Sequence, residues 1–294
     1  MRKKILLLIL IAAGMNGVTN AQGWLDSLSQ TSNSKTYTAA AFKTTRLINV
    51  HTLETVGRRT LDFRISHRFD VINSGSYNLW GLDGPATIRL GLEYSFDGKL
   101  MFGIGRSSFE KMWDGFLKYR LFRQTDDNSH PLSVTLLTGM YYTSQDDRDK
   151  DVNGFDKYEF TSSRLSYAYE VIAGRKFNDR FSLQAAPFFV HYNLVDMFTD
   201  KNDVYGASFA ARYKFSKRAA ITAEYSWRMN DYTQVKYYDS MGIGIEIETG
   251  GHVFQMHFTN SNGIVENQFF AHTNSRWDNM GIRLGFNISR VFTL

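Results

Sequence analysis

Segments in which apolar and polar side chains alternate dominate this sequence of 294 residues. In TIRLGLEYSF, Thr87–Phe96, every second side chain from Ile88 onward is apolar, while the positions between them include Arg89 and Glu93. A period of two is typical of a β-strand with one apolar and one polar face. Further segments of this kind begin at Leu61, Leu100, Leu132, Leu165, Tyr205, Ile221, Met241, Phe254 and Leu284. Such strands build either a soluble sandwich with the apolar faces inside or a membrane barrel with the apolar faces in lipid.

The N-terminal residues have the plan of a secretory signal peptide. Arg2–Lys4 are basic, Ile5–Ala13 form an apolar run too short to span a bilayer, and the small residues Thr19 and Ala21 surround a plausible cleavage point. We therefore expect residues 1–21 to be removed and the mature chain to leave the cytoplasm. The chain has no cysteine, which excludes disulfide bonds and a lipidated cysteine at the cleavage point.

Composition narrows the possible locations and partners. After the signal peptide no apolar run reaches the length of a spanning helix, so a membrane location requires a closed barrel. The formal net charge of +5 includes three cations of the signal peptide, which leaves about +2 for the mature chain. Because this charge is small and no basic stripe is present, we expect no nucleic-acid partner.

The connections between the strands favour the membrane barrel. The sequence predicts short turns at 97–99, 178–180, 216–218 and 250–251, and longer loops at 71–84, 109–115, 144–159, 193–203, 230–239 and 261–279. Strict alternation of short and long connections is expected of an outer-membrane barrel with short periplasmic turns and long external loops. We therefore predict an all-β fold, a transmembrane antiparallel up-and-down β-barrel, in the outer membrane of a Gram-negative bacterium after cleavage near Ala21.

The strand count divides the mature chain into two parts. Residues 58–294 accommodate about 12 strands, and an even count places both barrel ends on the periplasmic side. Residues 22–57 are predicted to form an N-terminal pre-barrel segment, periplasmic or lumenal, because Leu47 and Leu53 share a face with Asn49 and His51. The alternative is a barrel of 14 strands that takes two from this segment.

Several long segments resemble an uncharacterised family of Bacteroidota outer-membrane β-barrels, known as a membrane-bound β-barrel domain of unknown function. They are FKTTRLINVHTLET, LDFRISHRFD, WGLDGPATIRLGLEYSF, GIGRSSFEKMWDGFLKYRLFRQ, GGHVFQMHFTN and IRLGFNISRVF. The resemblance covers nearly the whole mature chain, from about Ala41 to the end. It implies the fold and the location. The family brings no established activity and no catalytic residues, so none is carried over to this chain.

The polar faces of the strands predict a lumen lined by charges of both signs. The candidate lining residues are Asp62, Arg64, Arg68, Arg89, Glu93, Lys118, Arg120, Arg212, Glu224, Arg228, Glu246, Glu248, His257 and Arg283. From the Gly250-Gly251 turn, Glu246 is expected to face Gln255, and Gly244 to face His257. Inward glycines such as Gly244 either leave room for solute, water or the N-terminal segment, or relieve sheet curvature.

One loop carries a partial metal-binding pattern. Asp149, Asp151 and Asn153 match the first half of an EF-hand calcium loop, and Phe155 could offer its carbonyl. Phe160 stands where the last ligand, a glutamate, is required, and no helices flank the loop, so a true EF-hand is excluded. The segment is interpreted as a solvated acidic loop or as a weak calcium site, and no other cofactor is expected.

Three classes of function fit the predicted barrel. The first is a narrow, porin-like channel or transport-related barrel for small polar or charged solutes. The second is a structural or interaction barrel with a closed, salt-bridged lumen. The third is an outer-membrane lipid-modifying enzyme, but Ser66 and His67 fall on opposite faces of one strand and no Gly-x-Ser-x-Gly motif is present, so we expect no enzymatic activity. The expected partners are outer-membrane lipids and the barrel-assembly machinery.

Overall fold

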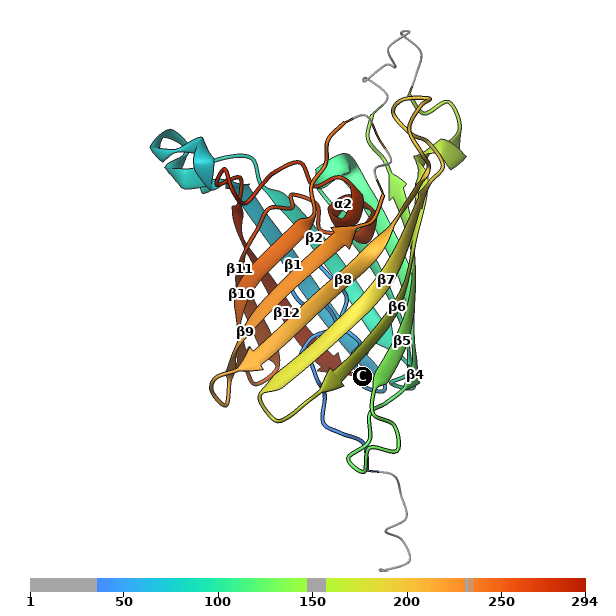
Figure 1. The fold of residues 1–294 in the computed structure, drawn as a ribbon, viewed down its shortest axis with the longest axis vertical. Helices are drawn as coiled ribbons and strands as arrows, with labels where there is room; N and C mark the ends of the chain where they lie inside the picture. Colours follow the sequence, from blue (N-terminus) through green and yellow to red (C-terminus); the bar gives the residue numbers. More distant parts are fainter. Residues whose placement is uncertain (1–35, 147–156, 231–232, 234) are drawn as a thin grey trace, which may run out of the picture.

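The protein folds as a closed barrel of 12 antiparallel strands in which each strand pairs with its sequence neighbours and β1 pairs with β12 (Figure 1). The computed structural model describes residues 36–146, 157–230, 233 and 235–294, so the predicted signal peptide lies outside the described residues. The strands are β1 (Thr60–Val71), β2 (Thr87–Ser95), β3 (Leu100–Ser107), β4 (Met112–Phe122), β5 (Ser133–Thr143), β6 (Leu165–Lys176), β7 (Phe181–Tyr192), β8 (Asp203–Lys214), β9 (Ala219–Arg228), β10 (Ser240–Thr249), β11 (His252–Thr259) and β12 (Arg283–Thr293). The predicted all-β, up-and-down barrel is confirmed, with 12 strands and not 14.

The apolar faces of the strands point away from the barrel axis. Leu90, Ile104 and Ile245 leave 46%, 55% and 48% of their surface exposed, whereas the alternating inward residues Arg89 and Glu93 are fully buried. Such an arrangement is stable only where the outside of the barrel lies in lipid. Among the described residues no helix is long and apolar enough to cross a membrane.

The predicted strict alternation of short and long connections is wrong at two places. We call the end of the barrel that holds the connections after β1, β3, β5, β7, β9 and β11 the loop end, and the opposite end the turn end. At the loop end β3 and β4 are joined by residues 108–111 alone, because Trp113 already pairs with Arg106 and Tyr142 inside the sheet. The predicted loop at 109–115 is therefore mostly strand. At the turn end, residues 123–132 make a long connection between β4 and β5.

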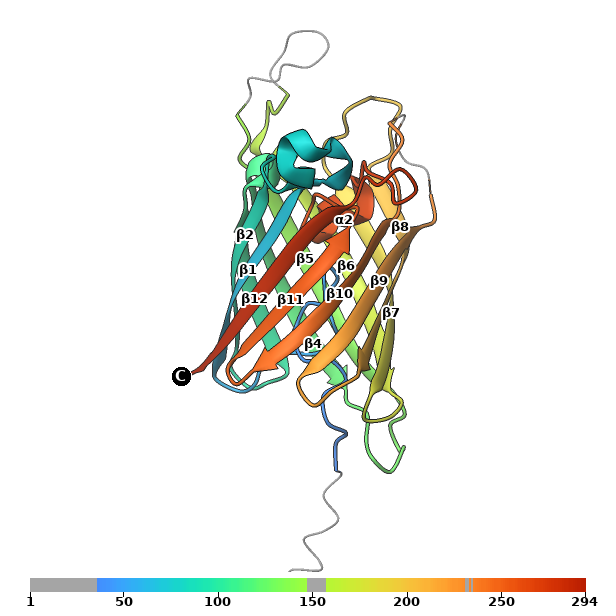
Figure 2. The same cartoon turned by 90° about the vertical axis from the view of Figure 1, so that its left-hand side faces the viewer.

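Residues 38–56, which we call the plug, enter the barrel from the turn end and fill much of the lumen (Figures 1 and 2). The Thr38 amide donates to the Gln124 carbonyl at 3.0 Å, which holds the entry of the plug against the long β4–β5 connection. Inside the barrel the chain reverses over residues 47–50, and Arg46 and His51 form an antiparallel bridge. Of the segment left open as periplasmic or lumenal, residues 38–56 thus lie in the lumen, and residues 22–35 lie outside the described residues.

A short helix closes the lumen from the loop end. This helix, α2 (Glu266–Ala271), belongs to the β11–β12 connection and folds inward, so that all its residues are buried (Figure 2). Phe270 of α2 stacks on Phe188 of β7 with ring centroids 3.8 Å apart. Phe269 and Phe270 join one apolar cluster with Leu47 and Val50 of the plug. The plug and α2 therefore share a continuous core inside the barrel.

Candidate functional site

The predicted lumen-lining residues all lie on the inner face of the barrel wall. Three of them, Arg120, Arg228 and Glu248, keep partial exposure near the barrel ends. The others are buried: Asp62, Arg64, Arg68, Arg89, Glu93, Lys118, Arg212, Glu224, Glu246, His257 and Arg283. Because the plug and α2 occupy the interior, these side chains contact protein and do not border an open pore.

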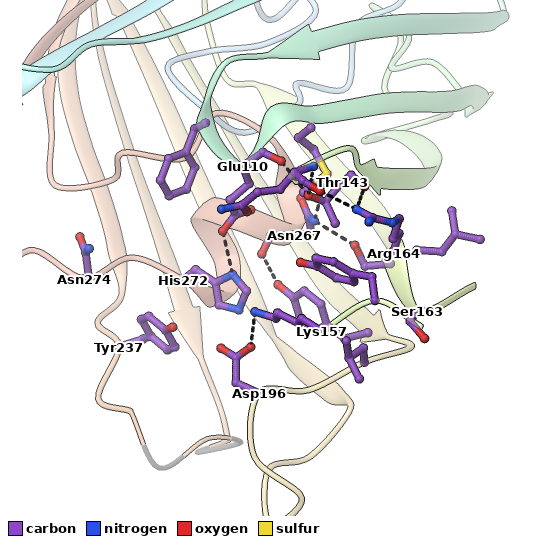
Figure 3. Close-up of a pocket in the computed structure, with 18 residues that line it drawn as sticks. Glu110, Thr143, Lys157, Ser163, Arg164, Asp196, Tyr237, Asn267, His272 and Asn274 are labelled. Carbon is purple, nitrogen blue, oxygen red and sulfur yellow. Dashed lines mark hydrogen bonds and ion pairs between the residues drawn. The ribbon is translucent and has the colours of Figure 1, made fainter. Parts of the chain in front are cut away.

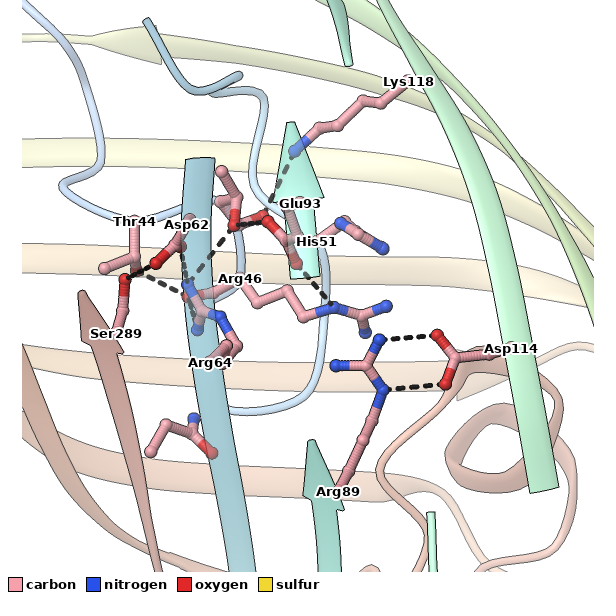
Figure 4. A network of polar contacts seen from close by, with 12 residues as sticks. Thr44, Arg46, His51, Asp62, Arg64, Arg89, Glu93, Asp114, Lys118 and Ser289 are labelled. Atoms are coloured by element: carbon pink, nitrogen blue, oxygen red, sulfur yellow. Dashed lines mark hydrogen bonds and ion pairs between the residues drawn. The ribbon is translucent and has the colours of Figure 1, made fainter. Parts of the chain in front are cut away.

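Some of the charges pair within the wall. Arg89 and Asp114 form two parallel hydrogen bonds, from Nε to Oδ1 at 2.9 Å and from Nη2 to Oδ2 at 2.5 Å (Figure 4). The Arg89 guanidinium packs closely on Gly91 and Gly105, since a Cβ at these positions would come within 2.5 Å and 2.3 Å of its nitrogens, respectively. These inward glycines therefore make room for a wall arginine.

A second wall pair, between Arg212 and Glu246, links β8 with β10. The β10–β11 register expected from the Gly250-Gly251 turn is confirmed. Glu246 pairs with Gln255 across the β10–β11 ladder, and Gly244 pairs with His257. Arg212 Nε donates to Glu246 Oε1 at 2.9 Å, and Gln255 Nε2 donates to Glu246 Oε2 at 3.1 Å. Glu246 thus accepts hydrogen bonds from two neighbouring parts of the wall.

Other wall charges bind the backbone of the plug. Lys118 Nζ donates to the carbonyls of Thr45, at 3.1 Å, and Glu54, at 2.5 Å. Arg68 Nη2 donates to the Ile48 carbonyl at 2.8 Å. These cations hold backbone carbonyls on both strands of the reversed plug.

An acid holds the tip of the plug. The amides of Ile48, Asn49 and Val50 all donate to the Glu224 carboxylate, at 3.0–3.2 Å. The tip therefore presents a row of N–H groups to one carboxylate, as a helix N-terminus does to an anion. Wall charges of both signs are thus matched to the backbone polarity of the plug.

Glu266, the first residue of α2, joins the plug to the loop end of the barrel. Its Oε1 accepts a hydrogen bond from Arg46 Nη1 at 2.6 Å, and its Oε2 accepts one from the Tyr141 hydroxyl at 2.6 Å. His51 Nε2 lies 3.4 Å from the same Oε1. We call Glu266, Arg46, His51 and Tyr141 the clasp. It connects a loop-end element to the plug, which enters from the turn end.

A pocket, which we call the mouth pocket, opens above α2 at the loop end (Figure 3). Its volume is about 200 Å³. The residues that line it are Phe109, Glu110, Met112, Thr143, Gln145, Lys157, Tyr158, Ser163, Arg164, Leu165, Ser166, Tyr192, Leu194, Asp196, Tyr237, Asn267, His272 and Asn274. Burial lowers the pKa of His272 below its usual range, against the opposing charges of Glu110 and Asp196. The pocket therefore combines aromatic rings with paired polar groups.

The proposed calcium ligands Asp149, Asp151, Asn153 and Phe155 lie outside the described residues. Within the part of the chain that the structure describes, no group of three or more His, Cys, Asp or Glu side chains is placed to hold a metal ion. The weak calcium site stays a prediction.

One histidine–carboxylate pair lies on the outer face of the wall at the loop end. His191 Nδ1 is 2.6 Å from Asp203 Oδ1, across the β7–β8 ladder. Acyl transfer also needs a nucleophile beside the imidazole. In the described chain, none of the hydrogen bonds of His191 reaches a serine hydroxyl. The expectation of no enzymatic activity stays a prediction.

Three residues of the charged interior, Asp114, Glu266 and Arg46, are not among the site residues predicted from the sequence. Asp114 lies in the stretch predicted as the loop 109–115, and Glu266 lies in the predicted loop 261–279, which is expected to be outside the barrel. A signal for the second was present, because Ile264, Val265 and Phe269 are unusually apolar for a solvated loop. Arg46 gave no comparable signal.

The fold and the filled, charged interior define a membrane-bound β-barrel. The chain belongs to the family described as Membrane bound beta barrel domain (DUF5777), whose model matches residues 42–292. The family expected from the sequence is confirmed, and its attribution to Bacteroidota stays a prediction.

Several solved barrels are similar to this chain in structure. The NanC porin has a TM-score of 0.48 and 9% identity, over 80% of this chain and 99% of that one. The KdgM porin has a TM-score of 0.47 and 10% identity, over 79% and 99%. Outer-membrane phospholipase A from Escherichia coli has a TM-score of 0.44 and 11% identity, over 78% and 92%. A search of curated proteins finds no match. These similarities concern the fold and carry no conclusion about activity.

Proposed function

We propose that the protein is an outer-membrane channel for small polar or charged solutes, closed in this state by the plug. The observation that supports this function is that charged side chains of the wall find their hydrogen-bond partners in the backbone of the plug. Lys118, Arg68 and Glu224 bind the plug backbone. Without the plug they would line a water-filled passage.

The energetics of buried charges favour a second state of the protein, in which the plug has moved and water reaches the wall of the lumen. Well-packed apolar side chains often stabilise a protein interior as well as buried ion pairs do, or better. A permanently filled barrel would therefore be about as stable with well-packed apolar side chains in place of Lys118 and Arg68, which are fully buried here. An interior that admits water when the plug moves needs such groups, because polar side chains keep an aqueous passage open.

Conductance in planar bilayers tests the channel. We expect the mature chain to conduct weakly. We expect a variant lacking residues 22–56 to open a stable pore, because α2 then loses the ion pair with Arg46 and the apolar cluster with Leu47 and Val50 that keep it inside the lumen. A reversible disulfide bond between the plug and the wall, which we call the lock, provides the matched experiment. An ideal Cβ at Gly242 lies 3.2 Å from Ile48 Cγ2, so Ile48→Cys with Gly242→Cys is within reach of a disulfide bond, and the chain has no other cysteine.

The lock is expected to hold the channel closed when oxidised and to restore wild-type openings when reduced, whereas Ile48→Cys alone is insensitive to reductant. Heat-modifiable migration in gels confirms that each variant is folded. A folded deletion variant with no conductance would overturn the channel and favour the structural or interaction barrel.

The outer-membrane location is part of the proposal and is supported by the signal-peptide pattern and by the loop-end connections. Tyr77, in the β1–β2 connection, is 94% exposed, and Lys217, at the turn end, is also exposed. We expect a membrane-impermeant thiol reagent to label Tyr77→Cys in intact cells and to leave Lys217→Cys unlabelled. Equal labelling of both variants would contradict this topology.

A further inference from the structure

We propose that the mouth pocket binds one small neutral polyol, of the size of a single sugar ring. We propose also that α2 couples the binding of this ligand to the position of the plug. The second half of this proposal rests on the channel function proposed above; the first half does not. The pocket volume of about 200 Å³ is below the roughly 300–1,000 Å³ of sites for drug-sized ligands, which limits the occupant to a small molecule.

Aromatic rings form one side of the pocket. The His272 ring stacks on Tyr192 with centroids 5.1 Å apart and lies 5.1 Å from Tyr237 at a tilt of 41°. Tyrosine offers an apolar ring face together with a hydroxyl that donates and accepts hydrogen bonds. A sugar ring has the matching surfaces, since it carries C–H groups on its faces and hydroxyls on its edge.

The charges of the pocket balance. Lys157 Nζ lies 2.7 Å from Asp196 Oδ1, and His272 Nδ1 lies 3.8 Å from Glu110 Oε1. The Arg164 guanidinium lies 4.3 Å from the centre of the Tyr158 ring. The lining thus contains two acids, Glu110 and Asp196, and two permanent cations, Lys157 and Arg164. A lining of this composition favours a neutral ligand whose hydroxyls both donate and accept.

The floor of the pocket holds a buried acceptor without a partner. Asn267 of α2 is 2% exposed, and its Nδ2 donates to Ser166 Oγ at 2.9 Å. The Tyr192 hydroxyl donates to the Asn267 backbone carbonyl. The side-chain Oδ1 of Asn267 receives no hydrogen bond from the described residues. Since buried polar atoms are nearly always paired, we assign this oxygen as the acceptor for a ligand hydroxyl.

The same helix reaches the plug on its other side. Asn267 lines the pocket, while its neighbour Glu266 binds Arg46 and His51 of the plug within the clasp. His272, which follows α2, also lines the pocket and donates its backbone amide to the Gln268 carbonyl at 2.8 Å. A ligand in the mouth pocket therefore touches both ends of a six-residue helix that holds the plug.

Binding to the purified full chain in detergent is measured by ligand-observed saturation-transfer NMR and calorimetry with D-glucose, D-galactose and D-mannose. Glucuronate and glucosamine serve as charged comparisons. We expect a neutral hexose to bind more tightly than either charged sugar and Tyr237→Ala to weaken it by at least about tenfold. Tyr238→Ala is the matched control, because Tyr238 is adjacent in sequence but does not line the pocket. Absence of hexose binding, or equal binding by the two variants, would overturn the site.

Conductance tests the coupling separately. The hexose that binds is expected to raise the open probability of the wild-type barrel. Glu266→Gln is expected to abolish this response while the hexose still binds, with its affinity changed by no more than the coupling factor. A hexose that binds without changing the conductance would disprove the coupling and leave the site. If the hexose binds but the variant lacking residues 22–56 does not conduct, the channel function fails and the binding site stands. If that variant conducts but no hexose binds, the site fails and the channel stands.

Discussion

Two ion pairs, one in the lumen and one at the mouth, have similar lengths but very different surroundings. The Arg89–Asp114 pair measures 2.5 Å, with side chains 0% and 1% exposed. The Lys157–Asp196 pair measures 2.7 Å, with side chains 36% and 58% exposed. An exposed pair exchanges its partner for water at little cost, whereas a buried charge without its partner is strongly destabilising. The wall of the lumen is therefore built to hold its arrangement, and the mouth can exchange protein contacts for a ligand.

The largest effect is expected from breaking the lumen pair. Asp114→Asn leaves the Arg89 guanidinium buried without its hydrogen-bonded carboxylate partner, which we expect to destabilise the barrel by about 3–5 kcal/mol. Urea unfolding in detergent measures the loss. Replacing both partners, with Arg89→Met and Asp114→Leu, is expected to recover most of it, because no unpaired charge remains. Equal stability of Asp114→Asn and wild type would contradict the distinction between the two regions.

An intermediate effect is expected where the wall holds the plug. Glu224→Gln removes the charge that accepts the amides of Ile48, Asn49 and Val50. Hydrogen bonds to charged groups contribute about 1.5–3 kcal/mol, so these amides should exchange with solvent roughly 10- to 100-fold faster.

Glu248→Gln is the control for this experiment. Glu248 pairs with Lys43 of the plug at 3.0 Å, but the Lys43 side chain is 43% exposed. Hydrogen-exchange mass spectrometry should therefore show little change over residues 47–50 in that variant. Faster exchange of the same amides in both variants would mean that charge near the plug, and not the bonds to Glu224, holds the tip.

The smallest effect is expected at the mouth. Asp196→Asn removes the exposed partner of Lys157 and should cost no more than about 1 kcal/mol of stability. High salt should reduce even this difference, because exposed charges are screened. Urea unfolding with and without about 1 M salt, a concentration at which exposed charges are strongly screened, provides the measurement. A loss as large as that of Asp114→Asn would show that the mouth is as rigidly built as the lumen.

The alternation of side chains was enough to establish which face of each strand lies outside. Leu90 and Arg89 were assigned to opposite faces from the pattern alone, and the structure exposes one and buries the other. The Gly250-Gly251 turn similarly fixed the pairing of Glu246 with Gln255. These features depend on residues close together in the chain, so the local periodicity and the residue types of the turns are sufficient to predict them.

The filling of the lumen was decided by the tertiary structure. The plug has no regular alternation of apolar and polar residues, and the loop that contains α2 has the length of an external loop. Neither segment therefore has a sequence pattern that predicts its position in the lumen. Arg46 and Glu266 meet across 220 positions of sequence, and Asn49 and Glu224 across 175. No local pattern encodes such contacts, because they form only after the strands have closed into a barrel. The sequence by itself determined a membrane barrel with a charged interior; closure of that barrel brought the plug, the clasp and the mouth pocket together.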